Sequence, residues 1–431
     1  MPTTTQLLEK LEAGGYRGIF EYIYCTDAQG ADGQARRYGE LIRDFEMRFG
    51  MGRQAEFFSA PGRTEVGGNH TDHQNGRVLA ASVNMDVIAV ASKNDEGVIR
   101  IKSHGYEMDS ISLKSLKPKD EERNKSASLV RGIAARFQAL GYEIGGFDAC
   151  TTSNVLKGSG LSSSAAYEVL VGTILNHLFN DGTIDPVRVA QIGQYAENHY
   201  FGKPCGLMDQ TASAVGGFVT IDFGDPEQPV VEKVEYDLAG SGYHLCIVDT
   251  GGNHADLTDD YASCPVEMRS VAKAMGKSVL REVEEQAFYE KLPALRKTCN
   301  DRAILRAMHF FGDNARVPKQ VQALRAGDFD TFKALVIESG NSSFRYLQNV
   351  YTTKNPWEQG VSLALALSER VLGGRGAWRV HGGGFAGTIQ AFVPHDLLEQ
   401  YKTVMETALG AGKCHVLSVR PVGGVRVEAG E

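Results

Sequence analysis

Long apolar runs are missing from this chain of 431 residues. A membrane-spanning helix needs roughly 18 or more consecutive apolar residues, and no stretch of the sequence reaches that length. The N-terminal segment MPTTTQLLEKLEAGG is polar and amphipathic and lacks the apolar core of a signal peptide. We therefore expect no membrane partner and no targeting segment, and we expect the protein to be cytoplasmic.

An excess of basic residues is also missing. The chain has 45 Lys and Arg against 53 Asp and Glu, a formal net charge of -8, whereas binding to nucleic acid phosphates needs clustered Lys and Arg. The seven cysteines are scattered, include no CxxC pair and match no zinc-ligand spacing. We therefore expect no nucleic acid partner and no Cys/His metal site, and the cysteine pattern is typical of a reducing cytosol.

The common nucleotide-binding motifs are missing too. No GxxxxGK[ST] occurs and no GxGxxG follows a strand-like run, which disfavours the P-loop and dinucleotide-binding folds. What the chain does have is 42% hydrophobic and 23% charged residues, a composition typical of a folded globular protein. Because 431 residues exceed one ordinary core, we expect two domains that meet at a cleft.

The sequence pattern changes along the chain. Residues 1–55 read as helix, polar loop and helix (QLLEKLEA, DAQGADGQ and RRYGELIRDFEMRFG), which we interpret as a cap. Short strand-like runs follow (EFFSA, VLAASV, DVIAVAS and later FDACTTS), and residues 263–350 are mostly helical in pattern. We predict an α+β fold with an N-terminal domain over residues 1–209 and a C-terminal domain over residues 210–431.

The segment GSGLSSSAA, Gly158 to Ala166, has the residues of an anion-binding loop. Its glycines allow the backbone to approach a bulky anion, and the helical pattern that follows would point first-turn N–H groups and a favourable dipole at that anion. A serine N-cap after a flexible turn is the simpler interpretation. Three consecutive serines followed by two alanines exceed what one cap requires, so we predict a phosphate-holding loop.

Three segments together resemble the GHMP small-molecule kinases, and galactokinases in particular. GSGLSSSAA resembles the second GHMP motif, and HGGGFAG, His381 to Gly387, resembles the third. PGRTEVGGNHTDHQNG, which starts at Pro61, resembles the galactokinase signature in which Pro-Gly-Arg is followed by Gly-Glu-His-Thr-Asp-Tyr. The resemblance implies the two-domain GHMP kinase fold with its active site in the cleft, and phosphoryl transfer from ATP with Mg²⁺ to the anomeric hydroxyl of a sugar.

A fourth segment carries the implied catalytic residue. KPCGLMDQ, Lys203 to Gln210, resembles the family's CGxMDQ, so the resemblance makes Asp209 the residue that accepts the proton of the sugar hydroxyl or orients it. Arg63 would be the cation that spreads the phosphoryl charge. Judged from the residues alone, Asp209 could instead be a helix N-cap and Arg63 a member of a surface salt bridge.

The resemblance also implies where ATP and magnesium bind. Magnesium is placed on Ser164 and Glu197, although these two could equally be a helix cap and a solvated helical residue. Galactokinases often carry a Trp near the adenine, but this chain has NKSAS there, so adenine stacking is unassigned; Ala386 replaces a glycine of the third motif. The implied ATP-binding residues are Gly158, Ser159, Gly160, Leu161, Ser162, Ser163, Ser164, Ala165, Gly383 and Gly384.

The implied sugar pocket departs from the family signature at two positions. Asn69 stands where the family has the Glu that reaches the C6 hydroxyl, and His73 stands where it has Tyr. A carboxylate facing C6 would repel a uronic acid, whereas Asn can donate a hydrogen bond and His70 or His73 can carry positive charge. The implied substrate-binding residues are Asn69, His70, Asp72, His73, Gly206 and Tyr261, the last assigned by its spacing from His254.

We therefore predict an ATP-dependent sugar-1-kinase that converts galactose to galactose 1-phosphate. Galacturonate is the alternative substrate, because the altered pair also resembles the signature of plant galacturonokinases; on the other interpretation Asn69 simply bonds the C6 hydroxyl of galactose. A non-catalytic sugar sensor on the same fold is a further alternative, disfavoured because the serine loop and Asp209 are both intact. We expect a monomer, with a homodimer as the alternative.

Overall fold

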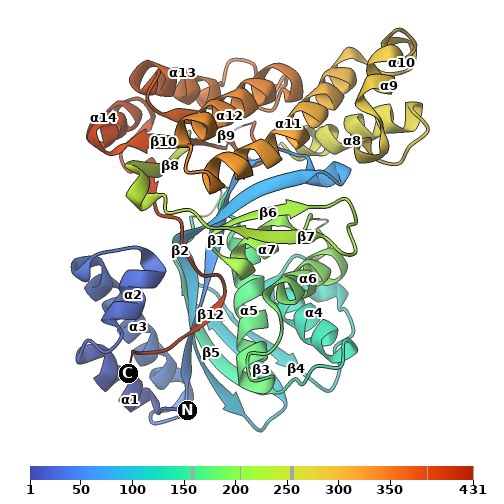
Figure 1. The fold of residues 1–431 in the computed structure, drawn as a ribbon. Coiled ribbons are helices and arrows are strands. Elements are labelled where there is room, and N and C mark those ends of the chain that lie inside the picture. The colour runs from blue at the N-terminus through green and yellow to red at the C-terminus, as the bar shows by residue number, and fades with distance from the viewer. Residues whose placement is uncertain (157–159, 204, 253–256, 386, 431) are drawn as a thin grey trace.

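The computed structural model describes residues 1–156, 160–203, 205–252, 257–385 and 387–430. Two sheets organise these residues, one of eight strands and one of four, and helices cover both (Figure 1). This arrangement confirms the predicted α+β class. Within the described ranges, no helix combines the length and the apolar content needed to span a bilayer.

The eight-stranded sheet has the order β12-β1-β2-β5-β3-β4, and β6 and β7 extend it from β2. Its pairs are antiparallel except β3 with β5. The strands are β1 (Glu56–Gly67), β2 (Arg77–Asn94), β3 (Val98–Ser103), β4 (Met108–Ser112), β5 (Gly146–Ser153), β6 (Phe218–Asp222), β7 (Val230–Val234) and β12 (Val425–Val427).

Three N-terminal helices cover one face of this sheet: α1 (Thr4–Glu12), α2 (Arg17–Tyr24) and α3 (Ala28–Phe49) (Figure 1). Successive strand residues point to opposite faces, so Phe57 packs against these helices while Phe58 packs on the other side. The predicted polar loop DAQGADGQ is instead the first part of α3. Asp27 starts that helix by accepting a hydrogen bond from the Gly30 N–H at 2.9 Å.

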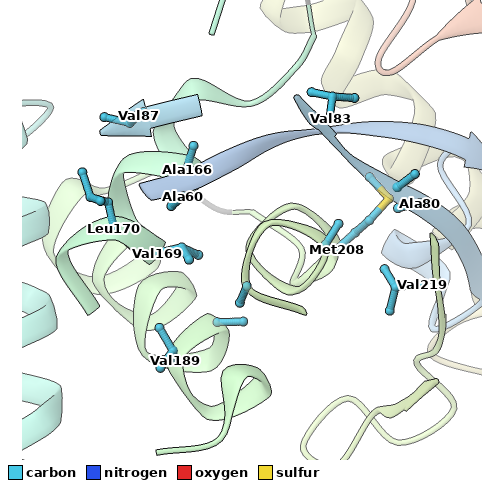
Figure 2. Close-up of a cluster of buried hydrophobic side chains, with 14 of the residues drawn as sticks. Ala60, Ala80, Val83, Val87, Ala166, Val169, Leu170, Val189, Met208 and Val219 are labelled. Carbon is cyan, nitrogen blue, oxygen red and sulfur yellow. The ribbon is translucent and has the colours of Figure 1, made fainter. Parts of the chain in front are cut away.

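Four helices cover the opposite face: α4 (Ser126–Ala139), α5 (Ser163–Phe179), α6 (Pro186–Ala196) and α7 (Met208–Val215). Figure 2 shows Val169 and Leu170 of α5 and Met208 of α7 in one apolar cluster with Ala60 and Ala80 of the sheet. Each large aliphatic side chain buried there contributes about 1.5–3 kcal/mol. This packing holds the first turns of α5 and α7 in place, and both turns belong to the predicted site.

The four-stranded sheet is antiparallel and has the order β11-β8-β10-β9. Its strands are β8 (Tyr243–Asp249), β9 (Ala377–His381), β10 (Thr388–Pro394) and β11 (Cys414–Leu417). Helices α13 (Gly360–Leu372) and α14 (Leu398–Leu409) pack on one face, and α11 (Asp301–Arg325) and α12 (Phe329–Ser342) pack on the other. Helices α8 (Thr258–Ala274), α9 (Glu285–Glu290) and α10 (Leu292–Thr298) complete the helical part predicted for residues 263–350.

The long hairpin of β1 and β2 links the two halves. The segments VLAASV and DVIAVAS, predicted as separate strands, form the single strand β2, which pairs with β1 from Ala91 opposite Glu56 to Leu79 opposite Gly67. The tip of the hairpin reaches the C-terminal half, where the Asn69 N–H donates to Asp313 of α11 at 2.8 Å. The signature segment therefore lies where the two halves meet.

The predicted domain boundary at residues 209/210 lies inside α7. Beyond it, β6 still pairs with β2 and β7 pairs with β6, so the chain passes to the second sheet only between Val234 and Tyr243. The chain later returns to the first sheet with β12.

Candidate active site

A pocket of about 290 Å³ opens at the tip of the β1–β2 hairpin. A volume of this size suits one small ligand. Most of the predicted catalytic and sugar-binding residues meet there, from the hairpin, the start of α7, α8 and the loop after β9. The lining residues are Arg63, Glu65, His70, Asp72, His73, Lys203, Cys205, Gly206, Met208, Asp209, Tyr261, Gly382 and Gly383.

Arg63 and Asp209 form a two-point ion pair on the wall of this pocket. The Arg63 Nε donates to Asp209 Oδ1 at 2.6 Å and its Nη2 donates to Oδ2 at 2.8 Å. The third guanidinium nitrogen, Nη1, donates to the Gly160 carbonyl. Ser162 adds a hydroxyl bond to Asp209 Oδ2 at 2.7 Å. One arginine thus joins the implied catalytic carboxylate to the glycine-serine loop.

These contacts set the charge of Asp209. Burial alone would raise its pKa, but the charge and hydrogen bonds of Arg63 and the bond from Ser162 outweigh burial, so the pKa lies below its ordinary value. Asp209 is therefore ionised at neutral pH. The two simpler interpretations do not hold: Asp209 follows the N-cap Leu207 and bonds Arg63 instead of capping α7, and Arg63 is only 7% exposed.

The described part of the glycine-serine loop begins at Gly160. Gly160 has a φ of +74°, which favours glycine, and the Leu161 carbonyl accepts a bond from the Arg63 N–H at 3.0 Å. Helix α5 then starts at Ser163, so Ser163, Ser164 and Ala165 supply its first turn. The predicted residues Gly158 and Ser159 lie outside the described residues, as do His254 and Ala386.

The third glycine-rich segment closes the pocket from the C-terminal half. The Tyr261 hydroxyl donates to the Gly384 carbonyl at 3.2 Å, and a Cβ on Gly383 would lie 2.6 Å from the Tyr261 ring. The His70 Nε2 lies 3.2 Å from the Gly383 carbonyl oxygen. Burial, with help from the nearby His73, lowers the pKa of His70 to about 4, so this ring is neutral at pH 7.

Gly206 and Asp72 approach each other closely. A Cβ on Gly206 would lie 2.5 Å from Asp72 Oδ2, so a side chain at position 206 would displace that carboxylate. His73 lies beside the same carboxylate, with its Nε2 4.0 Å from Asp72 Oδ1. These three predicted residues therefore stand together at the pocket.

Asn69 does not reach the pocket surface. Its side chain is fully buried, and its Nδ2 donates to Glu65 Oε1 at 2.9 Å and to the Gly382 carbonyl at 2.7 Å. Its Oδ1 accepts from Ser343 and Asn349. The amide is absent from the described lining of the pocket, because the hairpin tip is inserted into the C-terminal half and the amide bonds groups of both halves. Its contact with C6 of a sugar stays a prediction.

Glu65 is a pocket residue that the sequence analysis missed. It lies two residues after Arg63 on β1, and the alternation of a strand puts both side chains on one face. Its carboxylate is 5% exposed and pairs with the buried Arg379 at 3.0 Å. Burial raises its pKa to about 7 although Arg379 opposes this shift. The alternation around Arg63 is the signal that could have identified it.

A group of buried polar side chains lies behind Asp209. The Gln210 Nε2 donates to Glu168 Oε2 and to Glu197 Oε2, each at 2.9 Å, and the Lys203 Nζ lies 3.5 Å from Glu197 Oε1. Burial, followed by the charge of Glu197, raises the pKa of Glu168 well above its ordinary value. Glu197 is 3% exposed and so is not a solvated helical residue.

Comparison with known proteins agrees with this geometry. Residues 128–217 match the family model "GHMP kinases N terminal domain", and residues 43–93 match "Galactokinase galactose-binding signature". A galactokinase of Glaesserella parasuis serovar 5 (strain SH0165) is 32% identical over 366 residues, which cover 84% of this chain and 91% of the relative. A galactokinase of Actinobacillus pleuropneumoniae is 31% identical over 358 residues, covering 81% and 88%.

Solved structures show the same fold. The Lactococcus lactis galactokinase complexed with galactose superposes with a TM-score of 0.75 at 24% identity and covers 89% of this chain and 98% of its own. The L. major mevalonate kinase in complex with R-mevalonate gives a TM-score of 0.57 at 15% identity, covering 85% and 96%. The matching family model and the galactokinase relatives define a phosphotransferase of the GHMP kinase class, whose members use ATP. Within that class, the chain belongs to the galactokinase family.

Proposed function

We propose that this chain transfers the γ-phosphoryl group of ATP to the anomeric hydroxyl of galactose and releases galactose 1-phosphate. The observation that supports this most is the Arg63–Asp209 ion pair, which lies on the wall of a pocket for one small ligand and is bonded to the glycine-serine loop. The acceptor hydroxyl and the phosphate-holding loop would then lie on either side of this ion pair.

Asp209 would receive the sugar hydroxyl. In phosphoryl transfer the protein contributes mainly positioning and charge stabilisation, since the transition state is loose. An ionised Asp209 can accept a hydrogen bond from the anomeric O–H and align its oxygen with the γ-phosphorus. It can take up the proton as the new O–P bond forms and the bond from the γ-phosphorus to the leaving ADP breaks. Its lowered pKa makes it a weak base, so orientation is the larger part of its task.

The nucleotide phosphates would lie at the start of α5. The first-turn N–H groups of Ser163, Ser164 and Ala165 have no earlier helical residues to bond, and the helix dipole favours negative charge there. Arg63, held by Gly160 and Asp209, keeps further N–H groups that can face the transferred phosphoryl group.

Magnesium would be held by Ser164 and Glu197, together with phosphate oxygens and water. Hydroxyl and carboxylate oxygens are the ligands that Mg²⁺ prefers, and it takes few from protein when a nucleotide is present. Among the described residues, no group of three or more His, Cys, Asp or Glu side chains forms a metal site by itself. When bound, the ion would neutralise charge on the phosphates.

The galacturonate alternative lacks support. It rested on the absence of a carboxylate on the C6 side of the pocket, but Glu65 lines the pocket and Asn69 lies behind it. A sensor without activity is also disfavoured, because Asp209 lines the pocket and is bonded by Arg63 and Ser162. Monomer state and cytoplasmic location stay predictions from the sequence.

Coupled ADP release tests this proposal. Galactose, N-acetylgalactosamine, galacturonate and glucuronate would be compared at equal concentration with MgATP, and we expect galactose to give the highest kcat/KM. Phosphate release without sugar is the background to subtract. No sugar-dependent ADP with any of the four would rule out the sugar-kinase assignment.

A further inference from the structure

We propose that Glu65 is a specificity-determining residue: its carboxylate accepts a hydrogen bond from a neutral hydroxyl of the sugar and excludes sugars with a carboxylate at that place. This inference rests on the proposed function as a sugar kinase. It assigns to Glu65 the discrimination that the sequence had suggested for Asn69.

The orientation of the Glu65 carboxylate is fixed from behind. Both of its protein donors bond the same oxygen, Oε1: the Asn69 Nδ2 at 2.9 Å and the Arg379 Nη2 at 3.0 Å. Among the described residues, no side chain or backbone N–H donates to Oε2. This second oxygen is also not one of the buried atoms without a partner, so it keeps contact with the pocket.

The donors themselves are rigid. Arg379 is fully buried and also donates to the Val66 carbonyl at 2.8 Å. Asn69 is held by Gly382, Ser343 and Asn349. A carboxylate held in this way offers a single acceptor at a fixed place, which is what recognition of one hydroxyl needs.

The charges around Glu65 disfavour an anionic sugar. Asp72 is a second carboxylate on the pocket wall, and each lining Arg or Lys already has a carboxylate partner, Arg63 with Asp209 at 2.6 Å and the largely exposed Lys203 with Glu197 at 3.5 Å. His70 is neutral at pH 7 because burial lowers its pKa. A substrate carboxylate next to Glu65 would therefore be desolvated beside a like charge without a dedicated partner.

Glu65→Gln is the sharpest test. Arg379 and Asn69 are donors, so they will keep bonding the amide oxygen and turn the amide nitrogen toward the pocket. The pocket-facing acceptor becomes a donor with no change in shape. At pH 8, above the Glu65 pKa of about 7, we expect kcat/KM for galactose to fall about 10-fold or more and the galacturonate-to-galactose ratio to rise at least as much.

Glu56→Gln is the matched control. Glu56 lies at the other end of the same strand and also pairs with an arginine, Arg426, at 3.3 Å, but it is far from the pocket. Glu56→Gln should leave kcat/KM for galactose and for galacturonate within about twofold of wild type. Thermal melting should show that Glu65→Gln and Glu56→Gln are both folded. An unchanged ratio in folded Glu65→Gln would overturn the inference. So would a wild-type enzyme that phosphorylates galacturonate as well as galactose.

Failure of the proposed function looks different. A wild-type protein that phosphorylates none of the sugars would remove the sugar-kinase assignment itself. If Glu65→Gln does not fold, Glu65→Asp serves as the second variant. It retains the charge but withdraws it from the pocket, so galactose KM should rise while galacturonate stays excluded; an unchanged galactose KM would contradict the inference.

Discussion

At the scale of single residues, the Asp209 carboxylate accepts three hydrogen bonds, two from Arg63 and one from Ser162. Replacement by Asn keeps the shape but removes the charge that aligns the hydroxyl and accepts its proton. We expect Asp209→Asn to lower kcat by about 10²–10⁴-fold and to leave ATP binding measurable by calorimetry.

Asp222→Asn controls for the loss of a paired carboxylate. Asp222 bonds Arg77 and Arg281 outside the pocket, so this variant should keep nearly full kcat. Comparable loss of kcat in both variants would mean that Asp209 acts only through stability.

Gly206 provides a second residue-scale prediction. Since a Cβ there would lie 2.5 Å from Asp72 Oδ2, Gly206→Ala should push that carboxylate out of place. We expect the sugar KM to rise about 10-fold with the melting temperature little changed. Gly18→Ala is the control, because a Cβ on Gly18 in α2 meets nothing within 4 Å. Equal KM values in both variants would show that Asp72 does not bind the sugar.

Sequence patterns identified residues better than they identified side-chain directions. Arg63, Asp72, Gly206 and Tyr261 were predicted from motifs, and the structure brings them together. The direction of the Asn69 side chain could not be read from the sequence, because it depends on how deeply the hairpin tip enters the C-terminal half. The residues that bond Asn69, such as Asp313 and Ser343, lie 244 and 274 positions later in the chain.

At the scale of elements, Asp86 of β2 ties α2 and α3 to the sheet. It accepts bonds from Tyr24 of α2 at 2.6 Å, from Arg37 of α3 at 2.6 Å and from Arg420 at 3.1 Å. Asp86 is fully buried. Burial alone would raise its pKa, but Arg37 and Arg420 outweigh burial and lower it.

We expect Asp86→Asn to lower the free energy of unfolding by about 3–5 kcal/mol, because it leaves the buried Arg420 and the half-buried Arg37 without their charged partner. A carboxylate with a lowered folded pKa stabilises above its unfolded pKa of about 3.9, and that stabilisation is lost as pH falls through the folded value. The difference from wild type in urea unfolding should therefore be large at pH 7 and smaller near pH 3.

The exposed pair of Asp32 and Arg17 supplies a comparison, since both side chains are 52% exposed. Asp32→Asn should cost less than about 1 kcal/mol. A loss at pH 7 no larger than that of Asp32→Asn would contradict the anchoring role of Asp86.

Helices and strands were predicted well where the hydrophobic pattern extends over many residues, and poorly where residues distant in the sequence determine the conformation. The helix over RRYGELIRDFEMRFG was expected from its pattern and, except for its final glycine, lies within α3, and the expected strand FDACTTS lies within β5. The break expected between VLAASV and DVIAVAS does not occur, because Asn84 and Asp86 find partners in Ser418 and Asn154 and the chain stays extended. A local sequence pattern does not indicate hydrogen-bond partners that lie so far along the chain.

At the scale of the whole molecule, the C-terminal strand completes the first sheet. Val427 of β12 pairs with Phe57 and is 3% exposed among the apolar residues that the N-terminal helices cover. Val427→Asp would bury a charge there, and we expect a loss of several kcal/mol in thermal or denaturant unfolding. The neighbouring Glu428 is 66% exposed in its side chain, so Glu428→Asp should be neutral. Equal stability of the two variants would contradict a structural role for β12.

The place of β12 also bears on how the protein is made. Phe57, Phe58 and Ser59 pair with residues 425–427, which the ribosome adds long after the rest of that sheet. Domains usually fold in order from the N-terminus, but here the edge of β1 stays open until residues 425–427 have been synthesised. The nascent chain would therefore expose an unpaired strand edge over that interval, and a chain that stops before residue 425 could not complete its first sheet.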